Sequence, residues 1–91
     1  NVVVVVSNNG CWAGLGPNET PGVGKYLGHT SYDKVAEALG GWGRRVEDPA
    51  GIRPALEDAF ASGKPALVNV IVSPAKAVTQ PFGSLASAAV I

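Results

Sequence analysis

The sequence predicts an α/β fold, in which a parallel sheet is flanked by helices on both faces in a three-layer arrangement. Two apolar runs carry this prediction: Val2–Val6 consists of valine alone, and Ala66–Val72 reads ALVNVIV. Apolar runs without polar alternation are typical of strands that are covered on both faces, as in parallel sheets. Between the two runs lie two segments of helical periodicity and one short strand. This alternation of strands and helices favours helical crossovers between parallel strands.

The first helix is predicted over His29–Gly41. Its apolar residues recur at helical spacing and form one stripe, namely Tyr32, Val35, Ala36 and Leu39. Thr30 or Ser31 is expected to cap the helix, with Asp33 completing an approximate capping box with Thr30. Gly40 and the glycine after it are expected to end the helix in the left-handed conformation.

A short, partly exposed strand is predicted at Gly43–Glu47, with Trp42 before it as a packing anchor. Asp48–Pro49 then supplies the N-cap and the first residue of a second helix. The apolar stripe of that helix is Ile52, Ala55, Leu56, Ala59 and Phe60. Pro54 lies inside the stripe and is expected to kink the helix or to delay its start.

Both apolar runs are expected to be inner strands of the sheet. An inner strand needs a neighbouring strand on each side. A sheet of only three strands can hardly supply such neighbours for both apolar runs. We therefore expect further strands from a larger polypeptide. Asn69, in the middle of Ala66–Val72, is a polar group that must find a hydrogen-bond partner inside the protein.

The composition argues against several classes of partner. Lys and Arg number 7, and Asp and Glu also number 7, without clustering. We therefore expect no binding of nucleic acid, which needs clustered cations. The valine run is far too short to span a membrane, so no membrane association is expected. A single cysteine points to a reducing compartment, and the cytoplasm is the expected location.

The segment after the first strand is the candidate functional site. Asn8, Asn9 and Gly10 follow the valine run, and ligands of open α/β sheets bind just beyond the carboxyl ends of the strands. Asn-Gly is also the commonest hairpin dipeptide. A two-residue hairpin needs a strand directly after it, however, and Cys11–Pro17 contains too many breakers to be one. His29, the only histidine, is interpreted as a loop or helix-entry residue rather than a catalytic one.

The stretch VVVVVSNNGCWAG resembles the second half of the diphosphate-binding motif of thiamine-diphosphate-dependent enzymes. In that family Gly-Asp-Gly ends one strand and Asn-Asn ends the next, and the motif holds Mg²⁺ and the cofactor diphosphate. The downstream sequence from Ser31 to Pro74 also looks like the closing half of the family's cofactor domain. The resemblance implies that residues 1–76 are the C-terminal half of a thiamine-diphosphate-binding domain. Residues 77–91 would be a tail that could close over an active site.

Gly-Asp-Gly does not occur in the 91 residues. The resemblance therefore implies that an upstream segment of the same enzyme supplies it. It also implies a homodimer or homotetramer, because the glutamate that activates the cofactor comes from the other subunit in this family. No catalytic residue of this chain follows from the resemblance.

Asn-Asn-Gly followed by an apolar residue, an aromatic residue, one further residue and Gly is similar to the 2-hydroxyacyl-CoA lyase and oxalyl-CoA decarboxylase branch. The implied function is C–C bond cleavage or decarboxylation of an acyl-CoA or other small-molecule substrate. The near alternatives are carboligases that resemble acetolactate synthase or benzaldehyde lyase. A binding module of the same fold without catalysis is the alternative from another class.

The resemblance leaves two registers for the metal ligands. If the glycines are matched, the ligands are Asn8 and the carbonyl of Gly10, and Ser7 stands where the branch has its first Asn. If the Asn-Asn pair is matched to benzaldehyde lyase, the ligands are Asn9 and the carbonyl of Cys11. The sequence favours the second register, since Asn-Asn-x-x-Trp then aligns without a shift. The residues expected to contact the cofactor are Asn9, Gly10, Cys11 and Trp12.

Overall fold

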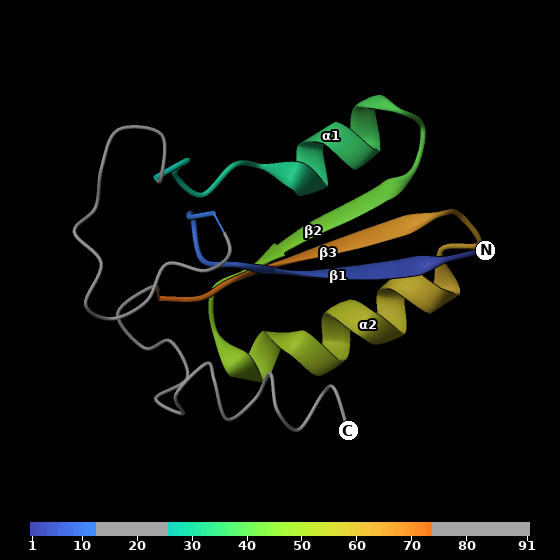
Figure 1. Ribbon diagram of the computed structural model, residues 1–91. Coiled ribbons are helices and arrows are strands. Elements are labelled where there is room, and N and C mark those ends of the chain that lie inside the picture. The colour runs from blue at the N-terminus through green and yellow to red at the C-terminus, as the bar shows by residue number, and fades with distance from the viewer. Residues whose placement is uncertain (13–25, 74–91) are drawn as a thin grey trace, which may run out of the picture.

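A computed structural model describes residues 1–12 and 26–73. The elements follow in the order β1 (Val3–Asn8), α1 (Tyr32–Ala38), β2 (Trp42–Val46), the 3₁₀ turn η1 (Pro49–Gly51), α2 (Ile52–Ala61) and β3 (Ala66–Ile71). Figure 1 shows α1 on one face of the sheet and α2 on the other. The predicted α/β fold with three layers is confirmed.

The sheet of the described residues has the order β1-β3-β2, and both pairs are parallel. Val68 in the middle of β3 pairs with Val5 on one side and with Arg44 on the other. The prediction that Ala66–Val72 is an inner strand is therefore confirmed. The same prediction for Val2–Val6 is wrong for the described residues, because β1 is an edge strand whose Val5 is 52% exposed. Apolar periodicity does not show that the last strand inserts between the first two.

The buried core lies between the sheet and α2. It consists of Val46, Ala55, Ala59, Ala66 and Val68, with Val3, Trp42, Ile52, Leu56 and Val70 packed against it. Two of the buried core residues are alanines of α2, which let the helix lie close to β3. Trp42 is the packing anchor that the sequence predicts. Phe60, which the predicted stripe includes, is 73% exposed and lies outside the core.

Helix α1 is shorter than predicted, and its predicted apolar stripe is only partly covered: Tyr32 and Ala36 are half-buried, whereas Val35 is exposed. Leu39, just beyond the end of the helix, is 84% exposed, and the buried residue of the helix is Asp33. The capping box is also wrong. Ser31 is the N-cap, and its side chain makes no capping hydrogen bond. The carboxylate of Asp33 accepts a hydrogen bond from Asn69 on β3. Gly40 has the expected left-handed backbone, with a φ of 91°.

The start of the second helix follows the sequence closely. The carboxylate of Asp48 accepts a hydrogen bond from the backbone N–H of Ala50, and Pro49 begins the 3₁₀ turn η1. The α-helix itself begins only at Ile52, so Pro54 lies in its first turn. A proline is tolerated there because the first N–H groups of a helix have no acceptor within the helix. The predicted delay of the helix start is confirmed.

Within the part of the chain that the structure describes, no helix is long and apolar enough to cross a bilayer. The tail expected at residues 77–91 lies outside the described residues.

At Gly43 on β2, helix α1 lies directly against the strand. A Cβ atom added at Gly43 would overlap the backbone carbonyl of Asp33. We expect Gly43→Ala to lower the free energy of unfolding by about 1–3 kcal/mol, since backbone atoms rather than a flexible side chain would have to move. Denaturant unfolding of the full-length protein measures this change.

The matched control is Gly51→Ala. Its added Cβ would meet a side-chain carbon of Val46 at 3.3 Å and no backbone atom. We expect a smaller loss of stability than for Gly43→Ala. Equal losses for the two variants would show that the approach of α1 to β2 is not constrained at Gly43.

Candidate functional site

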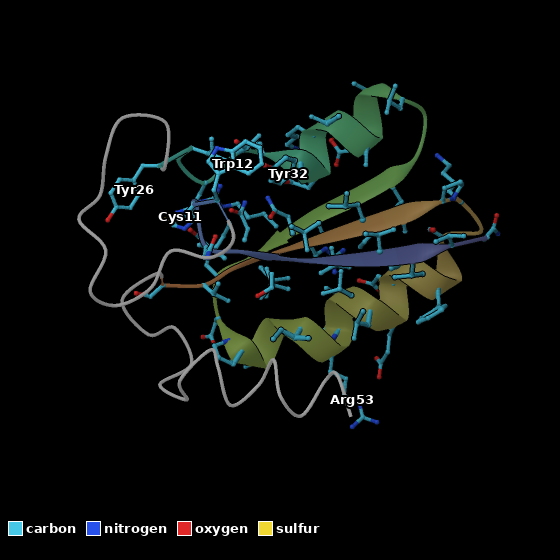
Figure 2. All side chains as sticks on the ribbon, in the orientation of Figure 1. Cys11, Trp12, Tyr26, Tyr32 and Arg53 are labelled. Atoms are coloured by element: carbon cyan, nitrogen blue, oxygen red, sulfur yellow. The ribbon has the colours of Figure 1, made fainter. Side chains whose placement is uncertain are left out.

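The candidate site lies at the carboxyl ends of the strands, where the chain leaves β1. Asn8 is the last residue of β1 and pairs with Ile71 of β3. The segment that follows is held against the segment before α1, because Cys11 forms an isolated antiparallel bridge with Tyr26. Figure 2 shows Cys11, Trp12 and Tyr26 together at this end of the sheet.

Gly10 makes the turn that follows the strand. Its φ is 73°, and its carbonyl oxygen accepts a hydrogen bond of 2.7 Å from the backbone N–H of Leu27. A Cβ atom at this position would lie 3.3 Å from the ring of His29 and 3.4 Å from the backbone of Gly28. A left-handed backbone in so close a contact favours glycine, which has no Cβ.

The side chain of Asn8 is buried and hydrogen-bonded at both ends. Its Nδ2 donates to the backbone carbonyl of Thr30 and to Oδ1 of Asn69, at 3.0 Å each. Its Oδ1 accepts from the backbone N–H of Gly10 at 3.1 Å. Both N–H donors of the amide are thus used, and one lone pair of its oxygen is not engaged by these bonds.

Asn69 continues this network toward helix α1. Its Nδ2 donates to the carbonyl of Thr30 at 3.0 Å and to Oδ1 of Asp33 at 3.1 Å. Asn8, Asp33 and Asn69 are the buried polar side chains of the described residues. The expectation that Asn69 must find a partner inside the protein is confirmed. The network connects the end of β1, the middle of β3 and the start of α1.

Asn9 has a different environment. It is half-buried, and its Oδ1 accepts from the backbone N–H of Cys11 at 3.0 Å. The two adjacent asparagines therefore make different contacts. The amide of Asn8 bonds to β3 and to Thr30, two residues before α1, whereas that of Asn9 bonds within its own turn.

Sequence reasoning missed the part that Asp33 takes in this site. An acidic residue in the first turn of a helix is usually read as a capping residue, and this was the expectation here. The available signal was the polar Asn69 in an apolar strand, because a buried amide requires partners from other elements.

The remaining candidates show no catalytic arrangement. His29 is exposed, with its Nε2 at 3.3 Å from the carbonyl oxygen of Val72, which agrees with a loop residue. Cys11 is a half-buried free thiol, and Trp12 is exposed. Within residues 1–12 and 26–73, no three His, Cys, Asp or Glu side chains lie close enough together to hold a metal ion. The turn from Asn8 to Cys11 offers neutral amide and carbonyl oxygens, and the carboxylate of Asp33 behind it is hydrogen-bonded to Asn69.

A groove of about 280 Å³ lies at the opposite end of the sheet. It is mostly apolar and runs between the start of β1, the end of α1 and the start of β3. Its lining residues are Val2, Val4, Ala36, Leu39, Gly40, Gly41, Pro65, Ala66 and Leu67. None of the candidate site residues lines it, so the groove and the candidate site are separate features.

Comparison with known proteins gives a consistent family match. Residues 1–70 match the family model described as thiamine pyrophosphate enzyme, C-terminal TPP binding domain. The chain is 48% identical over 82 residues to the acetolactate synthase large subunit IlvG of Mycobacterium tuberculosis, a match that covers 84% of this chain and 15% of that protein.

Two other relatives have different names. The chain is 39% identical over 82 residues to 2-hydroxyacyl-CoA lyase of Arabidopsis thaliana, covering 80% of this chain and 14% of that protein. It is 32% identical over 77 residues to oxalyl-CoA decarboxylase of Escherichia coli, again covering 80% of this chain and 14% of that protein. The chain thus spans only about one seventh of the length of these relatives. No solved structure matches it significantly.

The geometry at Gly10 generates a prediction about the turn. Gly10→Ala forces a side chain into a left-handed backbone, at a cost of about 1–2 kcal/mol, and adds contacts with His29 and Gly28. The matched control is Gly28→Ala, because Gly28 has nearly the same φ, 74°, and nothing within 4 Å of its added Cβ. We expect Gly10→Ala to lower the unfolding midpoint of the full-length protein more than Gly28→Ala does. A larger effect at Gly28 would contradict the close contact at Gly10.

Proposed function

Since this chain belongs to the family of C-terminal, thiamine-pyrophosphate-binding domains of thiamine pyrophosphate enzymes, we propose that it anchors Mg²⁺ and the diphosphate of thiamine diphosphate. The observation that carries this proposal is the position of Asn8. Its amide stands at the carboxyl end of a parallel strand, where ligands of α/β sheets bind, and is held by hydrogen bonds on both sides.

The donor set fits a magnesium ion. Mg²⁺ prefers oxygen ligands in a near-octahedral arrangement. The turn from Asn8 to Cys11 offers two amide oxygens and several backbone carbonyls within four residues. These ligands are neutral, so the diphosphate and an acidic residue from elsewhere would neutralise the ion. We propose that the upstream Gly-Asp-Gly segment of the same enzyme supplies that acid.

Within this turn, we propose Asn8 and the carbonyl of Gly10 as the ligands. The side-chain geometry supports this choice, although the sequence alone favours Asn9 and Cys11. Both N–H groups of the Asn8 amide are fixed, which fixes the direction of its oxygen, whereas the amide oxygen of Asn9 accepts a hydrogen bond within its own turn. The carbonyl of Gly10 accepts one hydrogen bond and has a second lone pair for a metal.

The proposed activity of the full-length enzyme is cleavage of a C–C bond in a 2-hydroxyacyl-CoA or a related substrate, in the cytoplasm. When bound, thiamine diphosphate supplies the nucleophilic carbon and the electron sink for this chemistry. The chain itself would bind and orient the cofactor through Asn8 and residues 10–12 rather than act as its acid or base. The sequence Asn-Asn-Gly-Cys-Trp supports the lyase branch. The relative named acetolactate synthase supports carboligation of a smaller substrate as the second candidate.

The exposed edge of the sheet supports a place within a larger enzyme. Val4 and Val5 point to opposite faces of β1, and they are 45% and 52% exposed. The groove of the described residues adjoins the same strand. We propose that another strand of the same polypeptide pairs with β1, and that the complete enzyme is a homodimer or homotetramer. Analytical ultracentrifugation of the full-length protein tests the assembly, and a monomer would contradict it.

Activity assays distinguish the two candidate reactions. The full-length enzyme is supplied with Mg²⁺ and thiamine diphosphate and is then given a 2-hydroxyacyl-CoA or pyruvate. We expect aldehyde release from the CoA ester. Product formation from pyruvate alone would favour the carboligase, and failure to bind the cofactor would favour a module without catalysis.

The metal register generates a further prediction. We expect Asn8→Ala in the full-length enzyme to weaken binding of thiamine diphosphate at fixed Mg²⁺ by at least tenfold, because one oxygen ligand is lost. Asn9→Ala should leave the affinity for thiamine diphosphate within a few-fold of wild type. It should lower the free energy of unfolding by about 0.5–3 kcal/mol. Titration with thiamine diphosphate, followed by calorimetry, measures both affinities.

Thermal unfolding of the cofactor-free variants is the control, since Asn8 also supports the fold. The reverse pattern, with weak binding only in Asn9→Ala, would assign the metal to Asn9 and Cys11. Normal binding by both variants would show that this turn is not the metal site.

A further inference from the structure

We propose that Asp33 and Asn69 are positioning residues that set the direction of the Asn8 amide, so that its oxygen rather than its nitrogen is presented at the end of the sheet. This inference rests on the proposed function and extends it to two residues that lie on other elements, α1 and β3. It explains why a carboxylate and an amide are buried behind a turn of neutral ligands.

The order of the hydrogen bonds determines the direction. An ionised carboxylate can only accept, so Asp33 requires the N–H₂ end of Asn69 to face it, at 3.1 Å. The Oδ1 of Asn69 is then turned toward Asn8 and requires the N–H₂ end of that amide, at 3.0 Å. The oxygen of Asn8 is left to face the turn, where Gly10 donates to it.

The carbonyl of Thr30 enforces the same direction. A carbonyl can only accept, and this one receives Nδ2 of both Asn8 and Asn69, at 3.0 Å each. A flipped Asn8 amide would place its oxygen against two acceptors in a buried site, where unsatisfied polar groups cost about 1–3 kcal/mol each. Both acceptors therefore oppose the flip.

The network should also strengthen the ligand. Hydrogen bonds in a chain polarise one another, particularly where water is excluded. Asn69 has an exposed fraction of 0% and Asp33 one of 4%, so the chain that begins at the carboxylate is shielded from solvent. The carboxylate polarises the Asn69 amide, which in turn polarises the Asn8 amide, and the oxygen of Asn8 thereby gains negative partial charge. Groups that hold a metal ligand in this way commonly change metal affinity by 10- to 100-fold when they are replaced.

The test compares Asp33→Asn and Asn69→Leu with wild-type full-length enzyme. Asp33→Asn is nearly isosteric but removes one of the two acceptors that hold the Asn69 amide, so that only the carbonyl of Thr30 still sets its direction. Asn69→Leu keeps the side-chain size and removes both of its polar ends. The dissociation constant of Mg²⁺ is measured by calorimetry at saturating thiamine diphosphate. We expect it to rise by about 10- to 100-fold in both variants.

The control is Val68→Ala, which alters the neighbouring residue of β3. Val68 is fully buried in the core against α2 and has no part in the polar network. We expect it to lower the thermal unfolding midpoint while leaving the Mg²⁺ dissociation constant within a few-fold. A loss of Mg²⁺ affinity without a matching loss of stability is the result that a purely structural role would not give.

The outcomes separate this inference from the proposed function. If wild-type enzyme binds thiamine diphosphate with Mg²⁺ and the two variants retain its Mg²⁺ affinity, the network does not position the ligand and only the inference fails. If Val68→Ala weakens Mg²⁺ as much as Asn69→Leu, the effect comes from stability, and the inference also fails. If wild-type enzyme binds neither Mg²⁺ nor cofactor, both the inference and the proposed function fail.

Discussion

The buried amide of Asn69 is the interaction on which the arrangement of this domain depends. It lies on the central strand and bonds to β1, to α1 and to Thr30, which lies two residues before α1. Hydrophobic packing on the opposite face, between α2 and the sheet, is not directional and would tolerate small shifts of the strands. Hydrogen bonds between buried amides have a required direction and distance. The network therefore fixes how the end of β1 lies relative to the start of α1.

The two faces of the sheet are built on different principles. The face toward α2 contains the buried apolar core, in which two alanines allow close packing. Helix α1 packs closely against β2 at Gly43. The face toward α1 is closed at the functional end by the polar network. At the other end it is open and forms the apolar groove. The apolar core that stabilises the domain thus lies on the α2 face of the sheet, and the polar network that orders the site lies on the α1 face.

This division is consistent with a piece of a larger enzyme. An edge strand made of valines is an unusual surface, since exposed apolar edges promote association. In the described residues, the edge of β1 and the groove beside it are exposed. The functional end, by contrast, is already ordered by hydrogen bonds within the chain. The proposed metal ligand would therefore be prepared before the cofactor arrives, while the sheet would be completed by the rest of the polypeptide.

The sequence by itself determined the fold class, the element order and the family. These properties are local: apolar runs define Ala66–Val72 as a strand, Asp48–Pro49 starts the second helix, and Asn-Asn-Gly after a valine run marks the site. Only the tertiary structure decided that β1 is an edge strand among the described residues, because strand order pairs segments that are distant in the sequence. It also decided that Leu39 and Phe60 are exposed. It also decided that Asp33 faces Asn69, which is 36 residues away, rather than capping its own helix. A side chain can satisfy the same hydrogen-bonding need locally or across the fold. The choice depends on which partner packing brings within hydrogen-bond distance, and for Asp33 that partner is Asn69, at 3.1 Å.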